Sequence, residues 1–98
     1  MDTDRPNPLE GLYRAVVVLV SAQGRIQERL AESFWQHLCH VDHTVLPPSV
    51  RQDFVALCAE LKSLLGDPDR AATIGDAKAG EYARRLILVY DAVLRSLP

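Results

Sequence analysis

Apolar side chains that recur every three or four residues are the feature that most constrains the fold of this chain. The clearest row runs through residues 26 to 41, where successive apolar positions are four, four, four and three residues apart. One side of an α-helix repeats at this spacing, because the helix has about 3.6 residues per turn. The pattern predicts an amphipathic helix whose buried row contains Ile26, Leu30, Phe34, Leu38 and Val41.

A second row predicts a helix that begins at about Pro48 and ends before Gly66. Pro47 and Pro48 cannot continue the preceding helix, and a proline fits the first turn of the next one. Beyond Gly66, residues 69 to 75 form a connector long enough for one helical turn. The side of this helix that we expect to be buried holds Val50, Phe54, Leu57, Cys58, Leu61, Leu64 and Leu65.

The last helix is predicted from Asp76 to about Ser96. Asp76 is placed to cap it, since a carboxylate at that position accepts hydrogen bonds from the free backbone amides of the first turn. Arg84, Asp91 and Arg95 fall on the side of this helix away from the core. The side chains expected to face the core are Tyr82, Leu86, Val89, Tyr90, Val93, Leu94 and Leu97.

The first helix is predicted to begin near Leu9. The valines at 16 to 18 are β-branched and suit a strand as well, so both states stay open for this segment although we expect a helix. Residues 1–8 are polar and contain two prolines, which predicts a flexible N-terminal arm. The expected buried row of the first helix is Leu9, Leu12, Val16, Leu19 and Val20.

These rows predict an all-α fold, a small antiparallel helical bundle of about four helices, with residues 9–98 as a single domain. The connections are short, which favours antiparallel neighbours. The longest apolar run, residues 15–20, is far shorter than the roughly 20 residues that a membrane span requires. We therefore expect no membrane partner.

Charge and composition disfavour several classes of partner. The net charge is −2 and basic residues form no block, which makes a nucleic-acid partner unlikely. The polar first residues lack the apolar stretch of a secretory signal, so a cytoplasmic location is the expectation. The excess of arginine over lysine, with abundant alanine, leucine and valine, suggests a GC-rich bacterial genome. No motif indicates a cofactor or a small-molecule substrate.

The histidines provide an alternative function, a metal-binding helical protein. His37 and His40 are three residues apart on the predicted second helix, and His43 lies three residues beyond His40. On an ideal helix, however, Cys39 points about 160° away from His37, and the usual spacing of two cysteines and two histidines is absent. The expected role of these imidazoles is structural, because partial positive charge near the C-terminus of a helix is stabilised by the negative end of the helix dipole.

The two cysteines do not indicate an enzyme. Cys39 and His43 would supply a thiolate and a base, but nothing in the sequence indicates the oxyanion donor that nucleophilic catalysis also needs. Cys58 lies within a buried row, where burial raises the pKa of a thiol. We expect two reduced thiols and no enzymatic activity.

A DNA-binding regulator is a further alternative. The last helix carries Arg84, Arg85 and Arg95, which could follow a DNA groove. Asp91 lies between two of these arginines on the same face, and the connector before the helix is longer than the tight turn of the helix-turn-helix motif. A solvated outer face is the simpler interpretation.

Some apolar residues remain after the core rows are assigned. Trp35 and Cys39 project away from the row of the second helix, Leu88 projects from the charged side of the last helix, and Val18 departs from the row of the first. A helix with two apolar sides can occupy a central position in a monomer, and this interpretation stays open. The other interpretation is an interface, because large exposed apolar patches are rare on monomers and tryptophan is enriched among binding hot spots.

The expected function is therefore a non-enzymatic protein–protein interaction module, a small bacterial accessory, adaptor or inhibitor protein. Its expected partner is a second copy in a homodimer, or a larger bacterial protein. We expect Trp35 to anchor the contact, with Cys39, Leu88 and Val18 as further interface residues.

Overall fold

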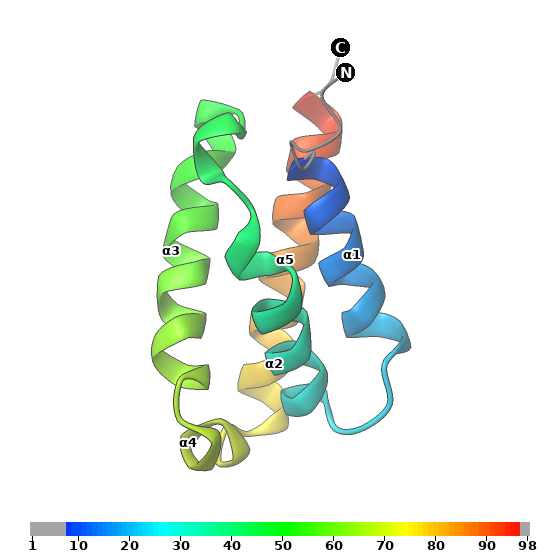
Figure 1. The fold of residues 1–98 in the computed structure, drawn as a ribbon, viewed down its shortest axis with the longest axis vertical. Helices are drawn as coiled ribbons and strands as arrows, with labels where there is room; N and C mark the ends of the chain where they lie inside the picture. Colours follow the sequence, from blue (N-terminus) through cyan, green and yellow to red (C-terminus); the bar gives the residue numbers. More distant parts are fainter. Residues whose placement is uncertain (1–7, 97–98) are drawn as a thin grey trace.

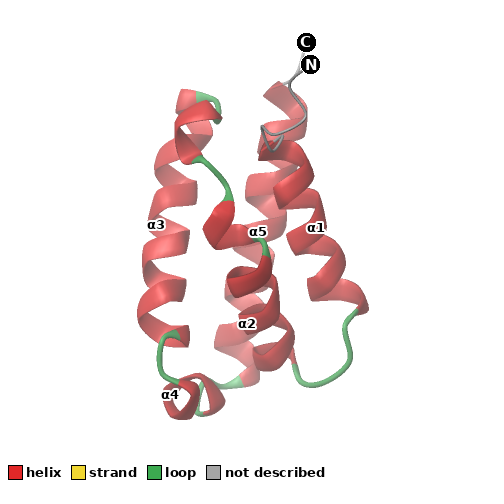
Figure 2. Cartoon of the chain, in the orientation of Figure 1, coloured by secondary structure: helices red, strands yellow, loops and turns green. Residues whose placement is uncertain are grey.

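The computed structural model describes residues 8–96, and every regular element in that range is a helix (Figures 1 and 2). Two 3₁₀ turns, η1 (Leu38–His40) and η2 (His43–Val45), follow the second helix. The α-helices are α1 (Pro8–Ser21), α2 (Ile26–Gln36), α3 (Pro48–Leu65), α4 (Pro68–Ala72) and α5 (Asp76–Ser96).

The four longer helices alternate in direction, as Figure 1 shows, and the short α4 lies at the turn between α3 and α5. Helix α5 packs against α1, α2 and α3, and α1 packs most extensively against α2. The predicted all-α antiparallel bundle is confirmed, and the valine run at 16 to 18 is helical within α1. Most of the predicted N-terminal arm, and Leu97, lie outside the described residues.

The core lies between these helices and follows the predicted rows closely. Each long helix contributes one side to this core. Within residues 8–96, no helix has both the length and the apolar character to cross a membrane. The buried apolar residues are Leu12, Ala15, Leu19, Leu30, Phe34, Leu38, Leu46, Val50, Phe54, Leu57, Leu61, Leu65, Ile74, Ala79, Tyr82, Ala83, Leu86, Val89 and Val93.

The second helix ends earlier than predicted. Helix α2 stops at Gln36, and His37 leaves the helical region with φ −131° and ψ −54°. The chain then forms η1 and η2, in which the carboxylate of Asp42 accepts hydrogen bonds from the amide and hydroxyl of Thr44, at 3.0 and 2.6 Å. Such local hydrogen bonds of aspartate and threonine side chains compete with the backbone hydrogen bonds of a helix. The apolar spacing persists through these turns, which keeps Leu38 buried and explains the longer prediction.

Three further expectations for helix sides and ends are wrong. Val20 and Leu94 are 63% and 41% exposed, because their neighbours Leu19 and Val93, which were also predicted to be buried, face the interior and turn the next position on each helix toward solvent. Asp76 is the first residue of α5, so the capping position belongs to Gly75, whose carbonyl accepts from the amide of Ala79 at 3.0 Å.

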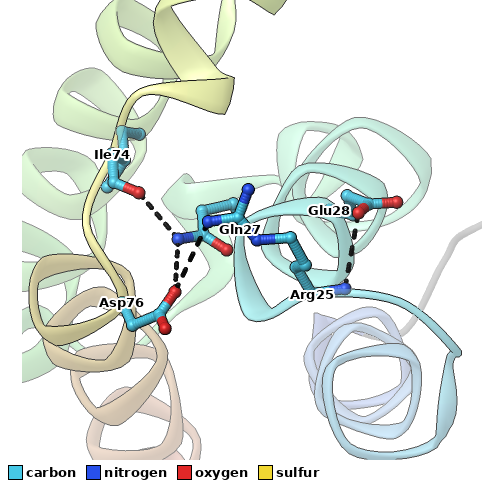
Figure 3. A network of polar contacts seen from close by, with 5 residues as sticks. All are labelled: Arg25, Gln27, Glu28, Ile74 and Asp76. Atoms are coloured by element: carbon cyan, nitrogen blue, oxygen red, sulfur yellow. Dashed lines mark hydrogen bonds and ion pairs between the residues drawn. The ribbon is translucent and has the colours of Figure 1, made fainter.

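A buried amide joins α2 to the start of α5 (Figure 3). Gln27 is only 3% exposed, and its Nε2 donates to the carbonyl of Ile74 at 2.6 Å and to Oδ1 of Asp76 at 2.7 Å. Arg25 lies 3.7 Å from the same carboxylate oxygen. This network fixes the connector after α4 against the first turn of α2, and it holds Asp76 in a role other than the predicted cap.

Candidate protein-interaction surfaces

Large apolar side chains that face solvent are the most distinctive feature of the surface. They are not scattered evenly: three lie on α1, three on α5, and the others near α2 and α3. Among the described residues these side chains are Tyr13, Val17, Val20, Trp35, Val45, Val55, Ile87, Leu88 and Leu94.

The largest group lies where α1 and α5 pack side by side. The rings of Tyr13 and Tyr90 meet with their centroids 6.4 Å apart. Tyr90 has Ile87 three residues before it and Leu94 four residues after it, so all three lie on one side of α5. On α1, residues 13, 17 and 20 likewise share one side. We call this surface the α1/α5 face, comprising Tyr13, Val17, Val20, Ile87 and Leu94.

A second apolar surface is an open groove between α2, η1 and α3, with a volume of about 310 Å³. Trp35 forms part of its wall and is 44% exposed. The indole N–H donates to the carbonyl of Leu65 at 3.3 Å, and the ring meets Phe34 edge-on with centroids 4.9 Å apart. We call this the Trp35 groove; it is lined by Phe34, Trp35, Leu38, Cys39, Val41, His43, Phe54, Val55, Cys58, Ala59 and Lys62.

Both cysteines line the Trp35 groove, but in different environments. Burial raises the pKa of the Cys58 thiol to about 12, and the nearby Cys39 adds to this shift. Cys39 is exposed, and its S–H donates to the carbonyl of Trp35 at 3.3 Å. The thiol hydrogen of Cys39 is therefore directed to a backbone oxygen and not to the His43 imidazole that lines the same groove.

The structure separates the four predicted interface residues. Trp35 and Cys39 meet in the Trp35 groove. Leu88 is 54% exposed and lines another groove, of about 410 Å³, between α3 and α5. Val18 is half-buried on α1. Tyr13, Val17 and Ile87 were not among the predicted interface residues, and Val20 and Leu94 were predicted to be in the core. A second row at positions 13, 17 and 20 was the available signal.

The predicted metal candidates are dispersed by the early end of α2. His37 occupies the position where α2 ends, His40 ends η1, and His43 begins η2. Within residues 8–96, no three histidine, cysteine, aspartate or glutamate side chains are arranged to hold a metal ion.

The arginines of α5 do not form one basic surface. Arg85 binds both carboxylate oxygens of Glu60 on α3, at 3.1 and 2.9 Å, and this pairing lowers the pKa of Glu60. Arg95 pairs with Asp91 at 2.8 Å on the same helix. Of the three arginines considered for DNA binding, only Arg84 lacks an ion pair within the described part of the chain.

Comparisons with protein-family models, with curated proteins and with solved structures each gave no match.

Proposed function

We propose that this chain is a non-enzymatic protein–protein interaction module that self-associates. The observation that carries the proposal is the α1/α5 face, where five large apolar side chains lie on two helices packed together. Contiguous apolar surface of this kind is uncommon on monomers. The core behind it is already filled by Leu12, Ala15, Leu19 and Leu86, so the exposed row is additional to what folding requires.

The Trp35 groove supports a second contact, with a larger partner protein. It presents a tryptophan edge and an apolar wall, which suits the insertion of an aliphatic or aromatic side chain. Such a module, in the bacterial cytoplasm, would act as an accessory, adaptor or inhibitor protein. Trp35 is the anchor residue of this contact, and Cys39 lies beside it.

Solution mass measured by light scattering over a concentration series tests the proposal. The wild-type chain is expected to approach the mass of a dimer as concentration rises. Val17→Asp places a charge in the α1/α5 face and is expected to return the chain to monomer with an unchanged circular dichroism spectrum. Val45→Asp is the matched control, since Val45 is an exposed valine on η2, and it is expected to leave the dimer intact. A wild-type monomer at every concentration overturns the proposal.

A further inference from the structure

We infer that the partner on the α1/α5 face is a second copy of this chain, related by a two-fold axis that makes the two α5 helices antiparallel. The inference rests on the proposed self-association and adds the occupant, its orientation and the residues that select it. Three observations carry it: the order of charges along α5, the position of an exposed leucine, and the register of α1 against α5.

The charged side chains on the outer side of α5 alternate in sign. A second copy of the helix that runs in the opposite direction would therefore place opposite charges against them. Four ionisable side chains lie on that side, away from buried Leu86: Glu81, Arg84, Asp91 and Arg95. Their signs along the helix are negative, positive, negative, positive. The other two cations of α5, Lys78 and Arg85, act instead on Glu60 of α3. The outer side of α5 therefore presents an alternating pattern without a net charge, within which Asp91 and Arg95 also pair with each other at 2.8 Å.

An antiparallel second copy turns this order into opposite-charge contacts. Glu81 of one copy then lies opposite Arg95 of the second copy, and Arg84 lies opposite Asp91, because each pair is placed almost symmetrically about residue 88. Two-fold symmetry repeats each contact, giving two of each kind. A parallel pairing of the two α5 helices would instead bring each charge against itself. Complementary charges select orientation, while exposed pairs add little affinity each.

An apolar side chain lies at the centre of this pattern. Leu88 is 54% exposed and falls midway between Glu81 and Arg95, so it would meet Leu88 of the second copy at the axis. Ile87 extends the apolar contact toward α1. Leu88 lines the groove between α3 and α5, where about half of its side chain still faces solvent, and the two-fold contact covers that exposed part.

The register of α1 agrees with the same axis. Since Tyr13 meets Tyr90 and the helices run in opposite directions, the midpoint of the row from Tyr13 to Val20 lies level with residues 86 and 87 of α5. The midpoint of Arg84 and Asp91 lies between residues 87 and 88. The two midpoints differ by one residue, or ~1.5 Å along a helix axis. One axis therefore places both the apolar row of α1 and the charges of α5 against their own copies.

Charge reversal tests the arrangement. The dimer dissociation constant is measured by sedimentation equilibrium for the wild-type chain, Arg84→Asp, Asp91→Arg and the double variant. Each single variant replaces two opposite-charge contacts between the copies by like-charge contacts, and we expect a weakening of about tenfold. Asp91→Arg also breaks the pair with Arg95 on its own helix. The double variant exchanges the two signs and is expected to bind within about threefold of the wild type. Arg70→Asp, on α4, makes the same change in net charge as Arg84→Asp and is expected to have no effect on the dimer.

The outcomes separate this arrangement from the proposed function. A wild-type dimer that both single reversals weaken and the double reversal restores establishes the antiparallel pairing. A wild-type dimer that the reversals leave unchanged, that the double variant does not restore, or that Arg70→Asp weakens equally, overturns this arrangement and leaves self-association standing. A wild-type monomer overturns both. Helical circular dichroism of every variant shows that a loss of dimer is not a loss of fold.

Discussion

At the scale of single residues, the side chain that most tightly joins distant parts of the chain is Gln27. Its amide satisfies a backbone carbonyl and a carboxylate that lie 47 and 49 positions away in the sequence. A glutamine two positions after the α1–α2 loop gives no sign of this role, because its partners are brought to it only by the packing of α2 against the end of α4. The spacing of apolar residues predicts which side of a helix is apolar. It does not predict which buried polar groups form hydrogen bonds with each other across the bundle.

Replacing Gln27 by glutamate should destabilise the fold. Gln27→Glu removes the donor and directs a carboxylate at Oδ1 of Asp76 and at the carbonyl of Ile74. We expect the free energy of unfolding to fall by about 3 kcal/mol, measured by urea denaturation at neutral pH. Gln23→Glu, at an exposed position in the loop before α2, is the matched control and should change it by less than about 0.5 kcal/mol.

The two thiols should react at different rates. Burial raises the pKa of Cys58 to about 12, so this thiol stays protonated at neutral pH, whereas Cys39 is exposed. Iodoacetamide should modify Cys39 and leave Cys58 intact in the folded chain, and should modify both in concentrated guanidinium chloride. Peptide mass spectrometry reads each site. Equal modification of both cysteines in the folded chain would contradict the burial of Cys58.

At the scale of elements, the sequence predicted the interiors of helices better than their ends. Helix α3 begins and ends as expected, because Pro48 and Gly66 are strong local signals. Helix α2 ends before its apolar row does, since the turns of η1 and η2 depend on Asp42 and Thr44 bonding to each other. The spacing of apolar residues survives in a 3₁₀ turn, so periodicity alone cannot locate that end.

The loop between α1 and α2 depends on a glycine. Gly24 has φ of +108°, which side chains other than glycine rarely adopt, and a Cβ there would lie 3.1 Å from the carboxylate of Glu28. Gly24→Ala should lower the free energy of unfolding by about 1 kcal/mol. Gly80→Ala, in α5 with open space around it, should raise it by about 0.5 kcal/mol through helix propensity. Thermal unfolding should show a lower melting temperature for Gly24→Ala and a higher one for Gly80→Ala than for the wild-type chain.

At the scale of the whole molecule, local patterns in the sequence predict the fold, but they do not predict which apolar side chains face solvent. Which side of a helix remains exposed depends on how many neighbours it has, and α5 contacts three helices while α1 contacts mainly two. Leu88 was predicted as an interface residue because it projects from the charged side of its helix. The α1/α5 face was not predicted, because Val20 and Leu94 fitted the core rows and only packing moves them to the surface.

One substitution should show whether the Trp35 groove contributes to the self-association that we assign to the α1/α5 face. Trp35 lies in a groove apart from the α1/α5 face, so Trp35→Ala should leave the dimer mass unchanged. It should lower the free energy of unfolding by about 2 kcal/mol, since the edge contact with Phe34 and the bond to the Leu65 carbonyl are lost. Light scattering and urea denaturation give both values. Dissociation of Trp35→Ala into monomers would instead place the tryptophan in the self-association contact.

The most direct test of antiparallel self-association is disulfide cross-linking at residue 88. In a background that carries Cys39→Ser and Cys58→Ala, Leu88→Cys places one thiol of each copy at the two-fold axis. Glu81→Cys is the control, because in this arrangement the two copies of position 81 are roughly 20 Å apart along the helix axis, beyond the reach of a disulfide. Mild oxidation should give covalent dimers rapidly at position 88 and slowly at position 81. Equal rates at the two positions, or no dimer at position 88, would contradict the account.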